Sequence, residues 1–200
     1  MKTVLLHTCC GPCGFSATKF LNGEFNIKYY WYNPNIQPPE EYEKRMNVAQ
    51  KLFSLITDDY DNKLWIQKVG EANKINLRNE GFQALVNGAN LHNNVVAHPL
   101  GWVSEANDKR CVECYRIRLM KTAQKSKELN ADFFSTTLLI SPYQQHSILK
   151  KMGEDIARQF GANFYYYDGR PDFYKNLNEF RKSGLYTQKY CGCLFSKNKK

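Results

Sequence analysis

All seven cysteines of this chain lie in three short groups, which the fold must bring together if they are to act jointly. The groups are Cys9-Cys10 with Cys13, Cys111-Val112-Glu113-Cys114, and Cys191-Gly192-Cys193. Cysteines that serve as small hydrophobic residues would fall on separate faces of the core, so this clustering favours metal or redox chemistry. In a cytoplasmic protein, which we expect here, a structural disulfide framework is rare.

The first two groups together offer four thiolates, from Cys9, Cys10, Cys111 and Cys114, which can hold zinc or a [4Fe–4S] cluster. A Cys-x-x-Cys pair at a helix start places two thiolates on one ion or cluster. Adjacent cysteines on an extended chain point to opposite faces and converge only in a turn, which Gly11-Pro12 supplies. A Cys-Cys pair is awkward for tetrahedral zinc but suits different irons of a cube. The spacing therefore favours an iron–sulfur cluster over structural zinc, and both over inert thiols.

The third group has a different spacing. Cys191 and Cys193 can close into a small strained disulfide, and such disulfides tend to be catalytic or regulatory. Lys189 beside them is expected to favour the thiolate. The alternative is a second metal clip. Cys13 receives no role, and His7 either points at the site or is a buried histidine with satisfied hydrogen bonds.

The chain alternates strand-like and helix-like patterns, which predicts a single α/β domain over residues 1–200, with a parallel sheet and helices on both faces. Expected strands cover residues 3–6, 25–32, 131–140 and 163–167, and expected helices cover residues 15–21, 38–56, 111–128 and 143–160. Gly11-Pro12 is expected to break regular structure. Ligands of such sheets bind beyond the carboxyl ends of the strands, and Cys9 and Cys10 follow the first strand directly.

Two segments depart from this alternation. Residues 73–108 are rich in asparagine and carry several glycines, which predicts an inserted, irregular loop that contacts substrate. Residues 168–200 are basic and aromatic and include Cys191 and Cys193, so we expect a C-terminal redox segment there. Residues 58–70 give no clear pattern.

The charge balance suggests a polyanionic partner. The chain has 28 Lys and Arg against 19 Asp and Glu, a formal net charge of +9. Candidates for RNA contact are basic residues interleaved with aromatic ones, although a solvated face explains them about as well. They are Arg110, Arg116, Arg118, Arg170, Arg181, Lys182 and Lys189, with Tyr32, Tyr115, Tyr186 and Tyr190. No apolar run approaches a membrane span and the first residues are too short for a signal peptide, so we expect a cytoplasmic protein with no membrane partner.

These residues also form a series of motifs that resembles one protein family, the cobalamin-independent epoxyqueuosine reductases. The motifs, in family order along the chain, are Leu5-Leu6-His7-Thr8-Cys9-Cys10-Gly11-Pro12-Cys13, Tyr32-Asn33-Pro34-Asn35-Ile36 with Glu41-Tyr42 and Arg45, Arg110-Cys111-Val112-Glu113-Cys114 with Arg118-Leu119, Thr136-Thr137-Leu138 with Ser141-Pro142-Tyr143, and Gln188-Lys189-Tyr190-Cys191-Gly192-Cys193-Leu194-Phe195-Ser196. Together they are specific, whereas a lone Cys-x-x-Cys would not be.

The resemblance implies reduction of epoxyqueuosine to queuosine at the wobble position of tRNA, the last step of queuosine biosynthesis. It implies a nucleotide-binding, HUP-like α/β fold and a [4Fe–4S] cluster on Cys9, Cys10, Cys111 and Cys114. It also implies a redox-active disulfide between Cys191 and Cys193 and allows an additional iron beside the cluster. The implied partners are tRNA carrying epoxyqueuosine and an electron donor of unknown identity.

Two alternatives belong to other functional classes. A sulfonucleotide reductase also uses Cys-Cys with Cys-x-x-Cys around a cluster, but would reduce adenylyl sulfate and ignore tRNA. A non-catalytic zinc module that binds RNA would contain zinc and need no reductant. A tRNA thiolase is less favoured, because the sequence has no Ser-Gly-Gly-x-Asp-Ser phosphate loop.

Overall fold

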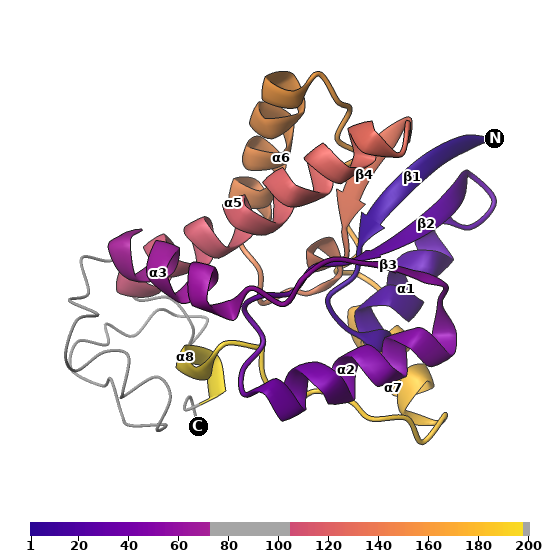
Figure 1. Ribbon diagram of the computed structural model, residues 1–200. Coiled ribbons are helices and arrows are strands. Elements are labelled where there is room, and N and C mark those ends of the chain that lie inside the picture. Colours follow the sequence, from indigo (N-terminus) through magenta and orange to yellow (C-terminus); the bar gives the residue numbers. More distant parts are fainter. Residues whose placement is uncertain (73–104, 198–200) are drawn as a thin grey trace.

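The computed structural model describes residues 1–72 and 105–197, and its centre is a four-stranded, all-parallel sheet. The strand order is β3-β2-β1-β4 (Figure 1). β1 (Lys2–His7) and β2 (Phe25–Trp31) form the middle of the sheet, and β3 (Leu55–Thr57) and β4 (Phe133–Thr136) lie at its edges. The prediction of an α/β fold with a parallel sheet is confirmed.

Helices cover both faces of this sheet (Figure 1). On one face Tyr29 of β2 hydrogen-bonds the Thr18 hydroxyl of α1 at 2.8 Å and stacks on Phe53, which follows α2. On the other face Leu5 of β1 packs in one hydrophobic cluster with Ile117 of α5. The helices in the described part of the chain are α1 (Gly11–Leu21), α2 (Pro39–Leu52), α3 (Asn62–Ala72), α5 (Glu105–Glu128), α6 (His146–Phe160), α7 (Phe173–Arg181) and α8 (Leu194–Lys197).

β1 determines where the functional residues meet. Val4, Leu5 and Leu6 are all completely buried, as expected of a central strand with helices on both sides. The strand pairs with β2 and β4, and His7 lies opposite Thr136 of β4. Because parallel strands end at the same edge, the residues that follow β1 and β4 lie together there.

The start of α1 corrects one expectation. Gly11 and Pro12 do not break regular structure, because α1 begins at Gly11 with Cys10 as its N-cap. Proline is tolerated in a first helical turn, where its missing N–H would have had no partner within the helix. The second cysteine group is also placed differently. α5 begins at Glu105, so Cys111 lies inside the helix and does not open it.

Other boundaries shift in ways that tertiary pairing explains. The expected helix over residues 38–56 ends at Leu52. Ile56 instead lies in β3, where it pairs with Tyr30 of β2. The expected strand over residues 131–140 is β4 followed by the 3-10 helix η2 (Thr137–Ile140). The expected strand over 163–167 contributes only an isolated parallel bridge between Phe134 and Phe164.

The two segments that depart from the alternation have different outcomes. The inserted loop expected over residues 73–108 lies outside the described residues, apart from 105–108, which belong to α5. Within the C-terminal segment expected over residues 168–200, the structure contains α7 and α8. The unclear stretch over residues 58–70 contributes most of α3.

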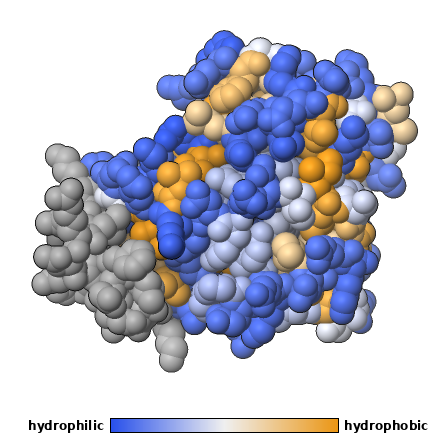
Figure 2. Space-filling view, in the orientation of Figure 1, coloured by the Kyte–Doolittle hydropathy of each residue, from blue (hydrophilic) through white to orange (hydrophobic). Residues whose placement is uncertain are grey.

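Hydrophilic residues cover most of the face shown in Figure 2, with separate hydrophobic patches between them. Across residues 1–72 and 105–197, the large hydrophobic side chains that remain exposed are Met1, Leu52, Leu64, Tyr143 and Tyr174. No helix within these two ranges has the length and apolar character needed to cross a bilayer.

Gly153 in α6 provides a test of this packing. A Cβ atom at this position would lie 2.3 Å from Phe164 Cε1, and Phe164 is itself held against Phe134 at a ring separation of 5.1 Å. Alanine normally stabilises a helix interior relative to glycine. Here we expect Gly153→Ala to lower the free energy of unfolding by about 1–3 kcal/mol in urea titrations, because the new Cβ would displace the ring of Phe164 from its contact with Phe134. Adding Phe164→Leu should remove most of this loss, and an unchanged loss in the double variant would contradict the steric explanation.

Candidate metal and redox centre

The first cysteine group lies where β1 ends and α1 begins. The Sγ atoms of Cys9, Cys10 and Cys13 all lie within 4.8 Å of one another, and those of Cys9 and Cys10 are 3.8 Å apart. Cys10 caps α1, and its Sγ accepts a hydrogen bond from the backbone N–H of Cys13 at 3.4 Å. The predicted convergence of Cys9 and Cys10 is therefore present, but a helix cap produces it in place of a Gly-Pro turn. Cys13, which the sequence left without a role, belongs to the same group.

The pKa values of these three thiols are shifted in different directions. Hydrogen bonds from Cys10 and Cys13, and then from Thr137, hold the pKa of Cys9 well below its usual value although burial opposes this. The Thr137 hydroxyl lies 3.2 Å from Cys9 Sγ. Burial raises the pKa of Cys10, and the hydrogen bond with Cys10 raises that of Cys13. The group thus ionises first at Cys9, and the other two thiols stabilise that thiolate as donors.

The second group comes from one turn of α5. Cys111 and Cys114 are three residues apart, so both project from the same side of the helix. Cys114 is buried against Trp65 of α3, and Cys193 packs on the same cluster. Burial raises the pKa of Cys111, as do the charges of Cys191, Cys193 and Cys114. The second and third cysteine groups therefore lie within electrostatic reach of each other.

The third group depends on a glycine. Gly192 has φ +141°, a conformation that favours glycine, and an added Cβ would lie 2.8 Å from Asn35 Nδ2. Cys191 and Cys193 are free thiols in this structure, so their disulfide stays a prediction. Cys191 reaches solvent, yet the protein atoms packed around its thiol, and then the charge of Cys193, raise its pKa to about 12. This direction is opposite to the thiolate stabilisation expected from Lys189.

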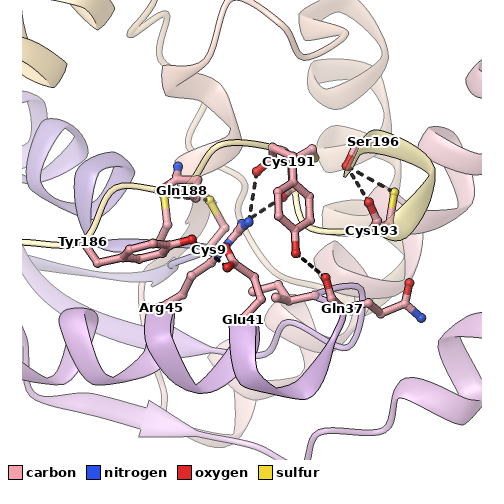
Figure 3. Close-up of polar contacts among 12 residues, drawn as sticks. Cys9, Gln37, Glu41, Arg45, Tyr186, Gln188, Cys191, Cys193 and Ser196 are labelled. Atoms are coloured by element: carbon pink, nitrogen blue, oxygen red, sulfur yellow. Dashed lines mark hydrogen bonds and ion pairs between the residues drawn. The ribbon is translucent and has the colours of Figure 1, made fainter. Parts of the chain in front are cut away.

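A buried guanidinium holds the third group in place (Figure 3). Arg45 of α2 donates through Nη1 to the Cys191 carbonyl at 3.1 Å and through Nη2 to the Tyr190 carbonyl at 3.0 Å. Its Nε donates to Glu41 Oε1 at 2.7 Å, and both side chains of this ion pair are almost fully buried. Arg45 therefore bonds the backbone that leads into Cys-Gly-Cys with geometry that only a forked, planar donor can satisfy.

Further hydrogen bonds join the same segment to the rest of the site (Figure 3). The Tyr186 hydroxyl donates to Glu41 Oε2 at 2.6 Å, and the backbone N–H of Gln37 donates to the Gly192 carbonyl at 2.8 Å. Gln188 Nε2 donates to Cys10 Sγ at 2.9 Å. The C-terminal segment thus contacts the first cysteine group directly.

The electrostatics of the centre fit a group ligated by thiolates. Arg118 is completely buried, and its Nη2 has no hydrogen-bond partner among residues 1–72 and 105–197. Burial lowers its pKa, but the charges of Cys114, Cys191 and Cys9 outweigh this and raise it. Buried thiols beside a buried cation suit soft metal ions or an iron–sulfur cluster, because the cation balances the negative charge of the ligands.

His7 is a buried histidine with satisfied hydrogen bonds, which was one of the two interpretations of the sequence. Its Nε2 is 3.1 Å from the Tyr32 carbonyl, and its Nδ1 is 2.9 Å from the Thr136 hydroxyl. A carbonyl only accepts, so we infer that Nε2 carries the proton and Nδ1 accepts from Thr136. Burial, and then Arg118, lowers the pKa of His7 to about 4, so the ring is neutral at pH 7.

Comparison with known proteins identifies the family. The family model described as epoxyqueuosine reductase QueH matches residues 4–84 and 83–199. The chain belongs to this family. A relative named epoxyqueuosine reductase QueH from Thermotoga maritima is 30% identical over 98% of this chain and 91% of its own length. The relatives of that name from Dehalococcoides mccartyi (30% identical, 96% of this chain, 91% of the relative) and Streptococcus pyogenes (27%, 97% and 70%) are similarly matched.

Several residues of this chain that were predicted from the sequence to contact RNA are not at the surface. Arg118, Tyr32 and Tyr115 are buried, so they cannot meet a phosphate or a base there. Arg116 and Arg170 are exposed but form ion pairs with neighbouring carboxylates. Interleaving of basic and aromatic residues along the chain carries no information on exposure, which explains this error.

The sequence also missed the roles of residues that organise the centre. Arg45 and Glu41 are four residues apart on α2, a spacing typical of helical ion pairs, but nothing in the sequence shows that the pair is buried. Thr137 and Gln188 are near cysteines only through the fold. The motifs of the family contain all four residues and were the one signal that could have found them.

The ion pair between Arg45 and Glu41 can be tested by substitution. We expect Arg45→Met to lower the free energy of unfolding by ~3–5 kcal/mol, because it leaves Glu41 buried without its partner. The released Cys191 should also react faster with iodoacetamide, measured by mass spectrometry of the intact protein. Arg45→Lys should retain part of the stability, but a lysine cannot keep the two hydrogen bonds to the carbonyls of Tyr190 and Cys191.

A matched control is the exposed ion pair between Arg158 and Asp155 on α6. Arg158→Met should change the free energy of unfolding by less than about 1 kcal/mol and leave alkylation of Cys191 unchanged. Equal alkylation rates in Arg45→Met and Arg158→Met would show that Arg45 does not hold the C-terminal segment.

Proposed function

We propose that this QueH-family protein is an oxidoreductase that converts epoxyqueuosine to queuosine at the wobble position of tRNA, the last step of queuosine biosynthesis. The observation that carries this proposal is that, in a chain of this family, the C-terminal Cys-Gly-Cys segment contacts both other cysteine groups. Gln188 donates a hydrogen bond to Cys10 Sγ at 2.9 Å, and Cys193 packs on the cluster that contains Cys114. Thiols from the first group, from α5 and from the C-terminal segment act on each other electrostatically, as the pKa of Cys191 reflects. Such a centre suits electron transfer to a bound base.

The reaction must balance two electrons and two protons. Both carbon–oxygen bonds of the epoxide break, a carbon–carbon double bond forms in the cyclopentane ring, and the oxygen leaves as water. Two electrons enter the product and two protons enter the water. The centre therefore needs a store of reducing equivalents close to the substrate.

We propose that Cys9, Cys10, Cys111 and Cys114 hold a [4Fe–4S] cluster. The resemblance to the family also allows an additional iron beside it. When bound, such a cluster supplies electrons and an iron that acts as a Lewis acid toward oxygen. Support comes from the buried thiols, from the stabilised thiolate at Cys9 and from the buried charge of Arg118.

The Cys191 and Cys193 thiols are proposed as the redox pair. Their oxidation to a disulfide releases two electrons and two protons, which matches one turnover. An external donor must then return two electrons, and the exposure of Cys191 gives it access. Arg45 positions this pair by donating a hydrogen bond to the Cys191 carbonyl. We assign residues 168–200 as the redox segment of a single domain.

The substrate must present its wobble base outside the helical stack. Anticodon loops are single-stranded, so their bases leave the stack at modest cost. The net charge of +9 favours association with the tRNA phosphates. We place the reaction in the cytoplasm, where tRNA is modified and thiols stay reduced.

Anaerobic turnover tests the function. The protein is reconstituted with iron and sulfide, mixed with a chemical reductant and tRNA carrying epoxyqueuosine, and the digested nucleosides are analysed by mass spectrometry. We expect loss of one oxygen atom from the modified nucleoside, dependent on protein and iron. Cys111→Ala should lose both visible absorbance and turnover, because it removes a cluster ligand. Cys191→Ala should retain the absorbance and lose turnover with donors that act through the thiol pair.

Other outcomes would assign other functions. Full absorbance in Cys111→Ala would contradict the ligand set. A wild-type protein that carries a cluster, leaves the tRNA unchanged and reduces adenylyl sulfate would be a sulfonucleotide reductase. Tight zinc binding with no visible absorbance would indicate a zinc module that binds RNA.

A further inference from the structure

Two exposed tyrosines and a partly buried phenylalanine form an aromatic cluster at the surface. Tyr143 and Tyr174 are 55% and 60% exposed, and their hydroxyl groups are 2.9 Å apart. Phe173 packs edge-on against both rings, with centroid separations of 5.9 Å and 5.0 Å. Large exposed rings that contact each other form a concentrated apolar surface, which typically marks a site of interaction.

This cluster adjoins the redox centre. Gln144, next to Tyr143 in the chain, directs its Nε2 toward Cys191 Sγ at 3.8 Å. The Oε1 of the same side chain accepts a hydrogen bond at 2.8 Å from Tyr115, which follows Cys114 on α5. One residue therefore separates the exposed rings from the thiols. A base that enters the centre brings its neighbours in the same strand to the surface around it.

The charge of the chain segment that carries Phe173 and Tyr174 suits a polyanion. Between residues 168 and 197 the chain carries six basic side chains against three acidic ones. All six basic side chains are exposed, and one of them, Arg170, forms an ion pair with Asp168. The other five are Lys175, Arg181, Lys182, Lys189 and Lys197. Lys175 directly follows Tyr174 in the chain. Proteins bind single-stranded nucleic acid by combining exposed rings, on which bases stack, with exposed cations, which meet the phosphates.

We propose that Tyr143, Phe173 and Tyr174 form a stacking platform for the unpaired bases that flank the wobble nucleoside in the anticodon loop. The proposal rests on the proposed function, because it takes tRNA as the substrate. The platform would hold the neighbouring bases while the modified base enters the centre past Gln144. Its rings bind RNA and take no part in electron transfer.

The test measures RNA binding without turnover. The probe is a fluorescently labelled hairpin with the sequence of the anticodon stem and loop and an unmodified guanine at the wobble position. Its Kd is measured by fluorescence anisotropy with the reconstituted protein. We expect Tyr143→Ala and Tyr174→Ala each to weaken binding by about 10-fold, because each removes one stacking surface. Tyr143→Phe and Tyr174→Phe retain the rings and should bind close to wild type.

Leu64→Ala is a matched control, because Leu64 is an exposed apolar side chain on α3. It should leave the Kd unchanged. With the modified tRNA and a chemical reductant, the alanine variants should raise KM more than they lower kcat. A loss confined to kcat would contradict a role in binding.

The outcomes separate this proposal from the proposed function. Wild-type turnover together with unchanged hairpin binding in both alanine variants would overturn the platform and leave the reductase intact. Weakened hairpin binding without turnover by the wild type would support the platform and overturn the reductase. Slower reduction by a protein donor, with normal RNA binding in the same variants, would assign the surface to that donor and overturn the platform.

Discussion

The buried ion pair between Glu41 and Arg45 is the interaction on which assembly of the centre depends. It lies on α2, yet the remaining donors of Arg45 bond the carbonyls of Tyr190 and Cys191, near the other end of the chain. Isolated buried ions are unfavourable, so the pair persists only while both partners and their hydrogen bonds are present. Placement of the Cys-Gly-Cys segment is therefore coupled to folding of the domain.

Buried charge also explains why the thiols of this centre behave differently. Burial raises the pKa of Cys10, Cys111 and Cys114, whereas hydrogen bonds from neighbouring thiols lower that of Cys9. Arg118 provides positive charge in the same region without direct ion pairing to a carboxylate among the described residues. A thiolate-ligated group would gain stabilisation from this cation. Cys191 is the cysteine of the centre that is exposed to solvent.

Patterns within one element were predicted more successfully than contacts between elements. β1, β2 and the C-terminal ends of α5 and α6 follow from periodicity and from signals such as Gly161, which adopts the left-handed conformation at the end of α6. The strand at β3 was missed because a short apolar run is compatible with either a helix or a strand until its partner is known. The exposure of Tyr143 and the burial of Tyr115 were equally inaccessible, because both depend on what packs against them.

The sequence by itself determined the fold class, the family and the identity of the cysteines that could act, because periodicity and motif order are properties of the chain alone. Only the tertiary structure decided that Cys13 joins Cys9 and Cys10, that Arg45 holds the C-terminal segment, and that His7 is neutral and enclosed. The physical reason is that burial, charge balance and hydrogen-bond partners arise between residues far apart in sequence. No local pattern encodes the dielectric surroundings in which a thiol or a guanidinium finally lies.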